Sequence, residues 1–308
     1  GERKNMNLPG VKVDLPVCGE KEIRDIQEFG IKNKVDFVAA SFVQSAQDVR
    51  DFRAALLDWA PNCHIIPKIE NVEGLLKFDE ILEAADGIMV ARGDLGMEIP
   101  FEKVVLAQKM MIAKCNLAGK PIITATQMLE SMVKAPRPTR AEATDVANAV
   151  FDGTDAVMLS GESANGLFFQ ESVEALTRCC YEAENSLDYS TLFETLHAFR
   201  GQTTSEENVC LAAVQTSLSV DAKVIVASGE IAGFLAKYRP QASIVAVCKE
   251  MPCLRHLLLR RGVHVVKAAP EESLDATALS YAKSNRLIQA GDKLVSVRAD
   301  GLINVLSA

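Results

Sequence analysis

The chain has 308 residues, of which 48% are hydrophobic and 24% are charged, and its formal net charge is -8 at pH 7. These values are typical of a well-packed soluble protein with about two domains. The acidic balance argues against nucleic-acid binding, and no apolar stretch approaches the ~20 residues that a membrane-spanning helix needs.

The N-terminal segment and the cysteines bear on where the chain starts and on its cellular compartment. Residues 1–5 are polar and run straight into Met6–Gly10, without the apolar stretch of a signal peptide, so we expect a cut edge here rather than a natural start. The eight cysteines show no C-x-x-C spacing, which predicts reduced thiols and a cytoplasmic location.

One unit recurs through the first half of the chain: a short apolar or β-branched run that ends in a polar residue, followed by a helical segment. The five runs are Phe37–Ser41, His64–Lys68, Gly87–Ala91, Pro121–Thr126 and Ala156–Ser160. Continuous apolar strands that alternate with helices predict a parallel sheet covered by helices, and a TIM-type (β/α)₈ barrel is its natural host. A whole barrel needs about 250 residues, so five units predict a partial barrel.

Helix and strand signals divide the rest of the chain. A capping box at Thr139–Glu142 predicts a helix to about Phe151, and a second helix is expected over residues 170–185. After a polar junction, a new α/β pattern predicts a smaller C-terminal domain. Its expected strands are 223–227, 243–248, 263–266, 293–297 and 302–306, with a helix over 273–289 and a hairpin turn at 298–301. We therefore expect the partial barrel over residues 1–187 and the C-terminal domain over residues 188–308.

The second and third strands end in charged residues. Lys68 and Glu70 are two positions apart, so on an extended strand they point to the same side, and Asp94 follows the next strand. Ends of adjacent parallel strands lie side by side, so Asp94 can meet Glu70. Two carboxylates suit Mg²⁺, and a lysine beside them can face a phosphoryl group. Taken alone, Lys68 and Glu70 are better explained as a surface ion pair at a strand end.

Other polar residues at strand ends carry weaker signals. Gly93 lets a ligand approach the backbone, although a simple turn explains it as well. Thr126 can position a proton through water, whereas Thr124 is better explained as a strand former. Single polar groups also follow strands at Ser41, Ser160 and Glu162, and the four histidines show no metal spacing.

Five segments in order resemble the pyruvate kinase family: Pro67–Asn71, Asp86–Gly96, Thr124–Met132, Pro136–Glu142 and Met158–Glu162. The resemblance runs from Asn7 almost to the end and weakens after about Leu187. It implies phosphoryl transfer from phosphoenolpyruvate to ADP, giving pyruvate and ATP in the last step of glycolysis. It also implies Mg²⁺ (or Mn²⁺) and K⁺ as cofactors and a homotetramer as the assembly.

The resemblance also implies residue roles. Glu70 and Asp94 would ligate Mg²⁺, and Lys68 would stabilise the phosphoryl group and the enolate. The substrate carboxylate would meet the N–H groups of Gly93 and Asp94, and Thr126 would lie where the enolate carbon collects its proton. Ser41 would belong to the potassium region.

Two departures from the family pattern limit these expectations. The family's first barrel strands and lid domain have no counterpart here, so the 308-residue chain alone is expected to be inactive. The stretch Val226–Ile231 carries Glu230 where regulated members hold a sugar bisphosphate, so fructose 1,6-bisphosphate is not expected to activate the enzyme. The alternatives are a Mg²⁺-dependent barrel lyase or aldolase acting on a pyruvate or enolpyruvate unit, and a non-catalytic fragment.

Overall fold

The structure is a computed structural model that describes residues 9–11, 15–268, 273–298 and 300–308. The described residues up to Cys115, together with Lys120–Ser186, form one compact unit, and Asn116–Gly119 with those from Leu187 onward form a second. The expected N-terminal edge at residues 1–8 and Ala299 of the expected hairpin turn lie outside the described residues. No described helix combines the length and the apolar character required to cross a bilayer.

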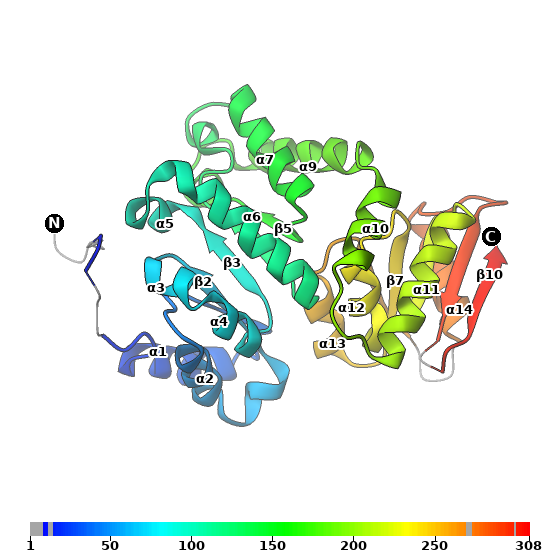
Figure 1. The fold of residues 1–308 in the computed structure, drawn as a ribbon, viewed down its shortest axis with the longest axis horizontal. Helices are drawn as coiled ribbons and strands as arrows, with labels where there is room; N and C mark the ends of the chain where they lie inside the picture. Colours follow the sequence, from blue (N-terminus) through cyan, green and yellow to red (C-terminus); the bar gives the residue numbers. More distant parts are fainter. Residues whose placement is uncertain (1–8, 12–14, 269–272, 299) are drawn as a thin grey trace. The chain divides into compact units, whose positions relative to one another are not determined.

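The first unit contains a sheet of five parallel strands in sequence order (Figure 1). Its strands are β1 (Phe37–Ala40), β2 (His64–Ile69), β3 (Ile88–Ala91), β4 (Ile122–Ala125) and β5 (Ala156–Met158). Each predicted apolar run coincides with one of these strands, although β2 continues one residue past its run to Ile69. The prediction of a partial α/β barrel followed by a smaller α/β domain is therefore confirmed.

Helices precede, connect and follow the strands of this sheet. They are α1 (Glu20–Asp25), α2 (Ala46–Ala55), α3 (Val72–Leu76), α4 (Phe78–Ala84), α5 (Arg92–Glu98), α6 (Phe101–Ala118), α7 (Arg140–Asp152), α8 (Gly161–Ala164) and α9 (Phe169–Asn185). A π-helical segment (Ile26–Ile31) and two 3₁₀ segments (Leu57–Asn62 and Glu130–Val133) complete the unit.

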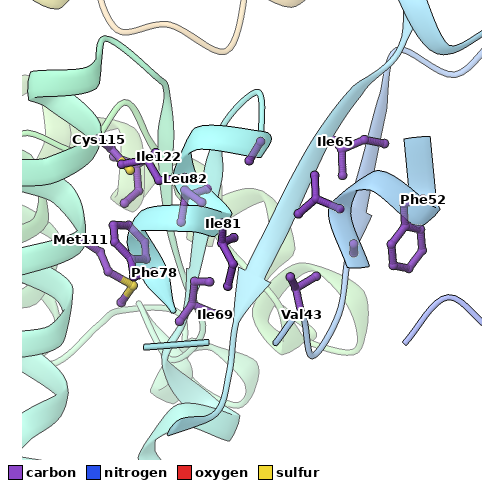
Figure 2. Close-up of a cluster of buried hydrophobic side chains, with 14 of the residues drawn as sticks. Val43, Phe52, Ile65, Ile69, Phe78, Ile81, Leu82, Met111, Cys115 and Ile122 are labelled. Atoms are coloured by element: carbon purple, nitrogen blue, oxygen red, sulfur yellow. The ribbon is translucent and has the colours of Figure 1, made fainter. Parts of the chain in front are cut away.

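The core of the first unit lies between the sheet and its outer helices. Figure 2 shows Phe78 and Leu82 of α4 close to Met111 and Cys115 of α6, with Ile122 of β4 beside them. All five side chains are at most 7% exposed. Burying an apolar side chain of this size contributes about 1.5–3 kcal/mol, so this packing fixes the strands and thereby the ends that carry the polar residues.

The second unit is a mixed sheet with helices on both faces. Its strands are β6 (Val224–Ser228), β7 (Ser243–Cys248), β8 (Val263–Lys267), β9 (Lys293–Val297) and β10 (Ile303–Ser307), in the order β10-β9-β6-β7-β8, with only the pair β9–β10 antiparallel among the described strands. Its helices are α10 (Tyr189–Ala198), α11 (Ser205–Ser219), α12 (Gly229–Lys237), α13 (Met251–Leu257) and α14 (Leu274–Ser284).

Alternate residues of β6 explain why helices cover both faces of this sheet. Ile225 and Ala227 pack into a cluster with residues of α11 and α12, whereas Val224 and Val226 pack with Ala278 of α14. Since successive side chains of a strand point to opposite faces, an uninterrupted apolar run has to be buried on both.

Two expected details are wrong, and one proline lies where its residue type is uncommon. Pro67 has no N–H to donate to a neighbouring strand, yet it is the fourth of six residues in β2; it is the last residue in register with β1, and the ladder to β3 starts at the next residue. The last strand of the first unit ends at Met158 rather than Ser160, where the backbone instead donates to Glu162. The helix expected to reach residue 289 ends at Ser284, because Arg286 adopts a φ of 58° and closes the helix end.

The capping box of α7 is confirmed and extends further than the sequence showed. Thr139 accepts a hydrogen bond from the Glu142 amide, and the Glu142 carboxylate accepts from the amide and hydroxyl of Thr139. The same carboxylate also accepts from the amide and hydroxyl of Ser131, at 2.7 and 2.6 Å. Glu142 thereby ties the start of α7 to the segment that follows β4.

The charge of Glu142 is expected to stabilise the fold. Burial alone would raise the pKa of its carboxyl, but the hydrogen bonds from Ser131 and Thr139 outweigh this and lower the pKa below its usual value. A lowered folded-state pKa gives stability that is present above the unfolded pKa and is lost as the pH falls. We expect Glu142→Gln to reduce the free energy of unfolding at pH 7 by about 1 kcal/mol, since it weakens the cap.

Chemical denaturation at pH 7 and at a series of decreasing pH values checks this expectation. The difference between wild type and Glu142→Gln should shrink as the pH falls through the lowered folded-state pKa, where the wild-type carboxylate gains a proton. The matched control is Glu130→Gln, because Glu130 is an exposed carboxylate in the same segment. Equal losses for the two variants at pH 7 would contradict the role of Glu142.

Candidate functional site

The polar residues expected at the strand ends lie at the carboxyl edge of the first sheet. Ser41 follows β1, Glu70 follows β2, Asp94 lies in the first turn of α5 after β3, and Thr126 follows β4. Because all these strands are parallel, their carboxyl ends meet at one edge, which is where α/β sheets bind ligands.

Glu70 is an almost fully buried charged group at this edge, with 1% of its side chain exposed. Its Oε1 lies 2.9 Å from Nζ of Lys68, and its Oε2 accepts a 2.6 Å hydrogen bond from the Phe42 amide. Phe42 has a φ of 54°, a left-handed value that is uncommon for a bulky residue. The chain after β1 therefore takes up a strained conformation while it presents its amide to the carboxylate.

Lys68 links two of the expected residues. Its ammonium donates to Oγ of Ser41 at 3.0 Å while it pairs with Glu70. About a quarter of the Lys68 side chain is exposed, so the ammonium is accessible from the edge of the sheet. The structure thus brings Ser41, Lys68 and Glu70 into one cluster, drawn from two neighbouring strands.

The charge on Asp94 acts on Glu70. Burial raises the pKa of Glu70, the hydrogen bonds from Lys68 and Phe42 lower it, and the negative charge of Asp94 raises it again, with a net rise. A carboxylate whose negative charge raises the pKa of its neighbour favours a cation between the two. Mg²⁺ is commonly held by one or two carboxylates together with substrate and water oxygens, so the donor set fits this ion.

No group of three or more histidine, cysteine, aspartate or glutamate side chains is arranged for a metal among the described residues. A site built here from protein ligands alone would therefore be incomplete. It would need oxygen atoms from a substrate or from water, as Mg²⁺ sites that bind phosphorylated substrates do.

Gly93 and Thr126 lie against each other. A Cβ on Gly93 would stand 2.7 Å from Cγ2 of Thr126, closer than such atoms approach in proteins. Thr126 itself has a φ of 77°, and Gln127 follows with a φ of 55°. For a β-branched residue this conformation is strained, and strain of this kind persists where the surrounding structure enforces it.

Arg92 enforces the conformation of Thr126, a role that sequence reasoning missed. Its Nε and Nη2 donate to the Thr126 carbonyl at 3.2 and 2.8 Å. The guanidinium is itself paired with Asp145 of α7 at 2.7 Å and donates to Gln108 of α6. The available signal was a cation directly after a fully apolar run, because such a cation, once largely buried, has to find a partner.

Three other polar residues near strand ends have structural partners. Glu162 is fully buried and accepts hydrogen bonds from the amides of Leu129 and Ser160, at 2.9 and 2.8 Å. Thr124 donates to the hydroxyl of Thr154 inside the sheet. These contacts account for Thr124, Ser160 and Glu162 without a ligand.

Comparison with known families agrees with the two units. The family model "Pyruvate kinase, barrel domain" matches residues 1–173, and the model "Pyruvate kinase, alpha/beta domain" matches residues 207–304.

Individual relatives match over almost the whole chain. A pyruvate kinase of Eimeria tenella is 56% identical over 304 residues, which cover 96% of this chain and 57% of the relative. A cytosolic pyruvate kinase isozyme of Glycine max is 47% identical over 332 residues, covering 99% and 65%. The crystal structure of a Cryptosporidium parvum pyruvate kinase superposes with a TM-score of 0.94 at 45% identity, covering 100% of this chain and 66% of that one.

The chain thus spans less than two thirds of the length of each of these relatives. The first of its two matched segments nevertheless carries the sheet whose carboxyl edge gathers Lys68, Glu70 and Asp94. On the family models and on these identities, the chain belongs to the pyruvate kinase family.

Proposed function

We propose that the protein transfers the phosphoryl group of phosphoenolpyruvate to ADP, giving pyruvate and ATP. The observation that carries the proposal is the cluster of Ser41, Lys68 and Glu70, with the charge of Asp94 beside it, at the carboxyl edge of the sheet. A cation next to paired carboxylates is what phosphoryl transfer requires, because this reaction depends mainly on positioning and charge neutralisation. Membership of the pyruvate kinase family supports the same reaction.

Glu70 and Asp94 are the residues that would hold a divalent ion. When bound, Mg²⁺ (or Mn²⁺) would neutralise negative charge on substrate and phosphoryl oxygens. The buried carboxylate of Glu70 would lose the repulsion from Asp94 that now raises its pKa. Glu70 directly follows β2 and Asp94 lies in the first turn of α5, so both carboxylates are held by regular elements and little reorganisation would be needed.

Lys68 would act on the phosphoryl group. Its ammonium now divides its hydrogen bonds between Ser41 and Glu70, and a phosphoryl oxygen would replace one of these acceptors. As the bond between phosphorus and the enol oxygen breaks, negative charge grows on that oxygen. A fixed ammonium stabilises this charge more than it stabilises the starting ester.

Gly93, Asp94 and Thr126 would orient the three-carbon unit. The first turn of a helix presents backbone N–H groups to ligands, and those of Gly93 and Asp94 in α5 would hold the substrate carboxylate. The enolate left after transfer gains a proton at its terminal carbon. The hydroxyl of Thr126, next to Gly93, would position the water that delivers this proton.

Further properties follow from this function as proposals. Ser41 would supply one oxygen to a K⁺ ion, and its hydroxyl would be available once the ammonium of Lys68 turns to the phosphoryl group. We propose a catalytic part in residues 1–187, an assembly or regulatory part in 188–308, a homotetramer, and a cytoplasmic location. We propose no nucleic-acid or membrane partner.

Product formation tests the proposal. The full-length protein, supplied with phosphoenolpyruvate, ADP, Mg²⁺ and K⁺, is expected to form ATP and pyruvate in equal amounts, measured by two separate coupled assays. Omission of ADP should stop pyruvate release. Pyruvate formation that continues without ADP would instead indicate a lyase or aldolase acting on the same carbon unit, and the absence of both products would indicate a non-catalytic protein.

Two substitutions should separate charge stabilisation from metal binding. Lys68→Met removes the ammonium but no metal ligand, so we expect kcat of the full-length enzyme to fall on the order of 10²–10³-fold while the affinity for Mg²⁺ is retained. Asp94→Ala should weaken the affinity for Mg²⁺, measured by titrating activity with the metal. An unchanged kcat in the first variant, or an unchanged metal affinity in the second, would remove that residue from its proposed role.

A methyl group at Gly93 should disturb the placement of Thr126. Since the added Cβ would lie 2.7 Å from Cγ2 of Thr126, we expect Gly93→Ala to lower kcat/KM for phosphoenolpyruvate about tenfold or more. The matched control is Gly96→Ala in the same helix, whose Cβ would meet its nearest neighbour, Val104 Cγ2, at 3.8 Å. Similar kinetics in the two variants would contradict the close approach of Gly93 and Thr126.

A further inference from the structure

Two cysteines of the second unit bring their sulfur atoms into contact. Cys248 is the last residue of β7, and Cys253 lies in α13, which begins three residues later. Their Sγ atoms are 3.8 Å apart. The two thiols of this single βα connection therefore touch directly, with no other atom between them.

Gly229 lies next to both sulfur atoms and has no side chain to displace them. A Cβ on this residue would collide with Sγ of Cys248 and would lie 2.9 Å from Sγ of Cys253. Gly229 begins α12 directly after β6, the strand that pairs with β7. The absent side chain at Gly229 therefore creates the space in which both thiols meet.

The pair lies in the wall of a cavity of about 730 Å³. The cavity is also lined by Ser228, Lys249 and Arg298 of the same unit. Cys248 is buried, with 3% of its side chain exposed, whereas Cys253 is half-buried. A small solute in the cavity can therefore reach the pair, and it meets Cys253 more readily.

We propose that Cys248 and Cys253 form a reversible disulfide when the protein meets a hydroperoxide. Cys253, as its thiolate, attacks the peroxide; the O–O bond breaks, Cys253 becomes a sulfenic acid, and one water or alcohol leaves. The sulfur of Cys248 then attacks the sulfenic sulfur, the S–O bond breaks, and a second water carries away the thiol proton. A dithiol reductant returns the two electrons and restores both thiols.

The two cysteines have different parts in this sequence because their surroundings differ. Burial, together with the neighbouring Cys253, raises the pKa of Cys248 to about 12, so Cys248 remains a thiol at neutral pH. A protonated and buried thiol is a poor first target for a peroxide. It is well placed as the second thiol, because contact with Cys253 makes its attack intramolecular.

Formation of the bond requires only a local movement. The sulfur atoms have to approach from 3.8 Å to about 2 Å, which side-chain rotation can supply when the side chains already face each other. The new bond would bring the parts of the cavity wall at Cys248 and Cys253, on either side of Lys249, closer together. The adjacent pair Cys179 and Cys180 offers an internal comparison, since neighbouring cysteines do not readily bridge.

Peptide mapping tests the proposal directly, because Lys249 lies between the two cysteines. The folded 308-residue chain is treated with hydrogen peroxide, free thiols are blocked with N-ethylmaleimide, and the protein is digested with trypsin without reduction. Cleavage after Lys249 places Cys248 in peptide 238–249 and Cys253 in peptide 250–255, since the bond from Arg239 to Pro240 resists trypsin.

The expected product is the two peptides joined, with a mass two hydrogens below their sum, and dithiothreitol should remove it. Cys248→Ser and Cys253→Ser should each abolish it, and the Cys248→Ser variant should accumulate oxidised Cys253. The proposal is overturned if both cysteines are recovered alkylated, or if wild-type Cys253 gains oxygen while Cys248 remains alkylated. The result is read from the masses of the peptides, so the test does not depend on catalytic activity.

A glycine substitution tests the packing that holds the pair. Gly229→Ala should lower the yield of the joined peptides severalfold, because its methyl group occupies the space where the sulfurs meet. The control is Gly201→Ala, whose Cβ would meet no atom within 4 Å. A yield in Gly229→Ala equal to that of the control would overturn the inferred geometry.

Discussion

The burial of the Glu70 carboxylate is the constraint on which the candidate site depends. A carboxylate that is 1% exposed has lost most of its hydration, which costs several kcal/mol unless partners replace the water. Lys68 and the amide of Phe42 provide such partners, and the amide does so from a left-handed backbone. The charge of Asp94 then adds repulsion that these partners do not remove. The arrangement is one that a cation would stabilise.

The fold satisfies this constraint through the parallel sheet. The apolar packing of β2, β3 and their helices fixes the strands, and their carboxyl ends then meet at one edge. Arg92 fixes the residue that follows β4, because its guanidinium holds the carbonyl of Thr126, whose backbone is strained. A strained hydroxyl-bearing residue that is clamped by a buried, ion-paired arginine is consistent with a site that depends on exact placement.

The sequence predicts those parts of the site that depend on strand period. Lys68 and Glu70 are two residues apart, so their placement on one side of β2 follows from the geometry of a strand, and the structure pairs them at 2.9 Å. The five parallel strands follow from the apolar runs. By contrast, the interior position of Pro67 in β2 could not be predicted from propensity, because it depends on where the ladder passes from β1 to β3.

Contacts between residues far apart in the sequence could not be predicted either. Arg92 meets Thr126 and Asp145 from positions 34 and 53 residues away, and no local pattern specifies such a pairing. The left-handed φ of Phe42 and Thr126 is equally hidden, because both are residues that rarely adopt it. Strain is imposed by tertiary contacts, so it can be inferred only when these contacts are known.

Comparison of three buried glutamates shows why burial alone does not mark a site. Glu162 is matched by two backbone amides, and Glu207 by the ammonium of Lys237 and the hydroxyl of Tyr238, at 2.6 and 2.7 Å. Both are satisfied by the protein and need no ligand. Glu70 has comparable partners but also faces the charge of a second carboxylate, and its lysine is accessible from outside. It is this second negative charge, rather than burial, that distinguishes the carboxylate proposed to hold a metal from those that support the fold.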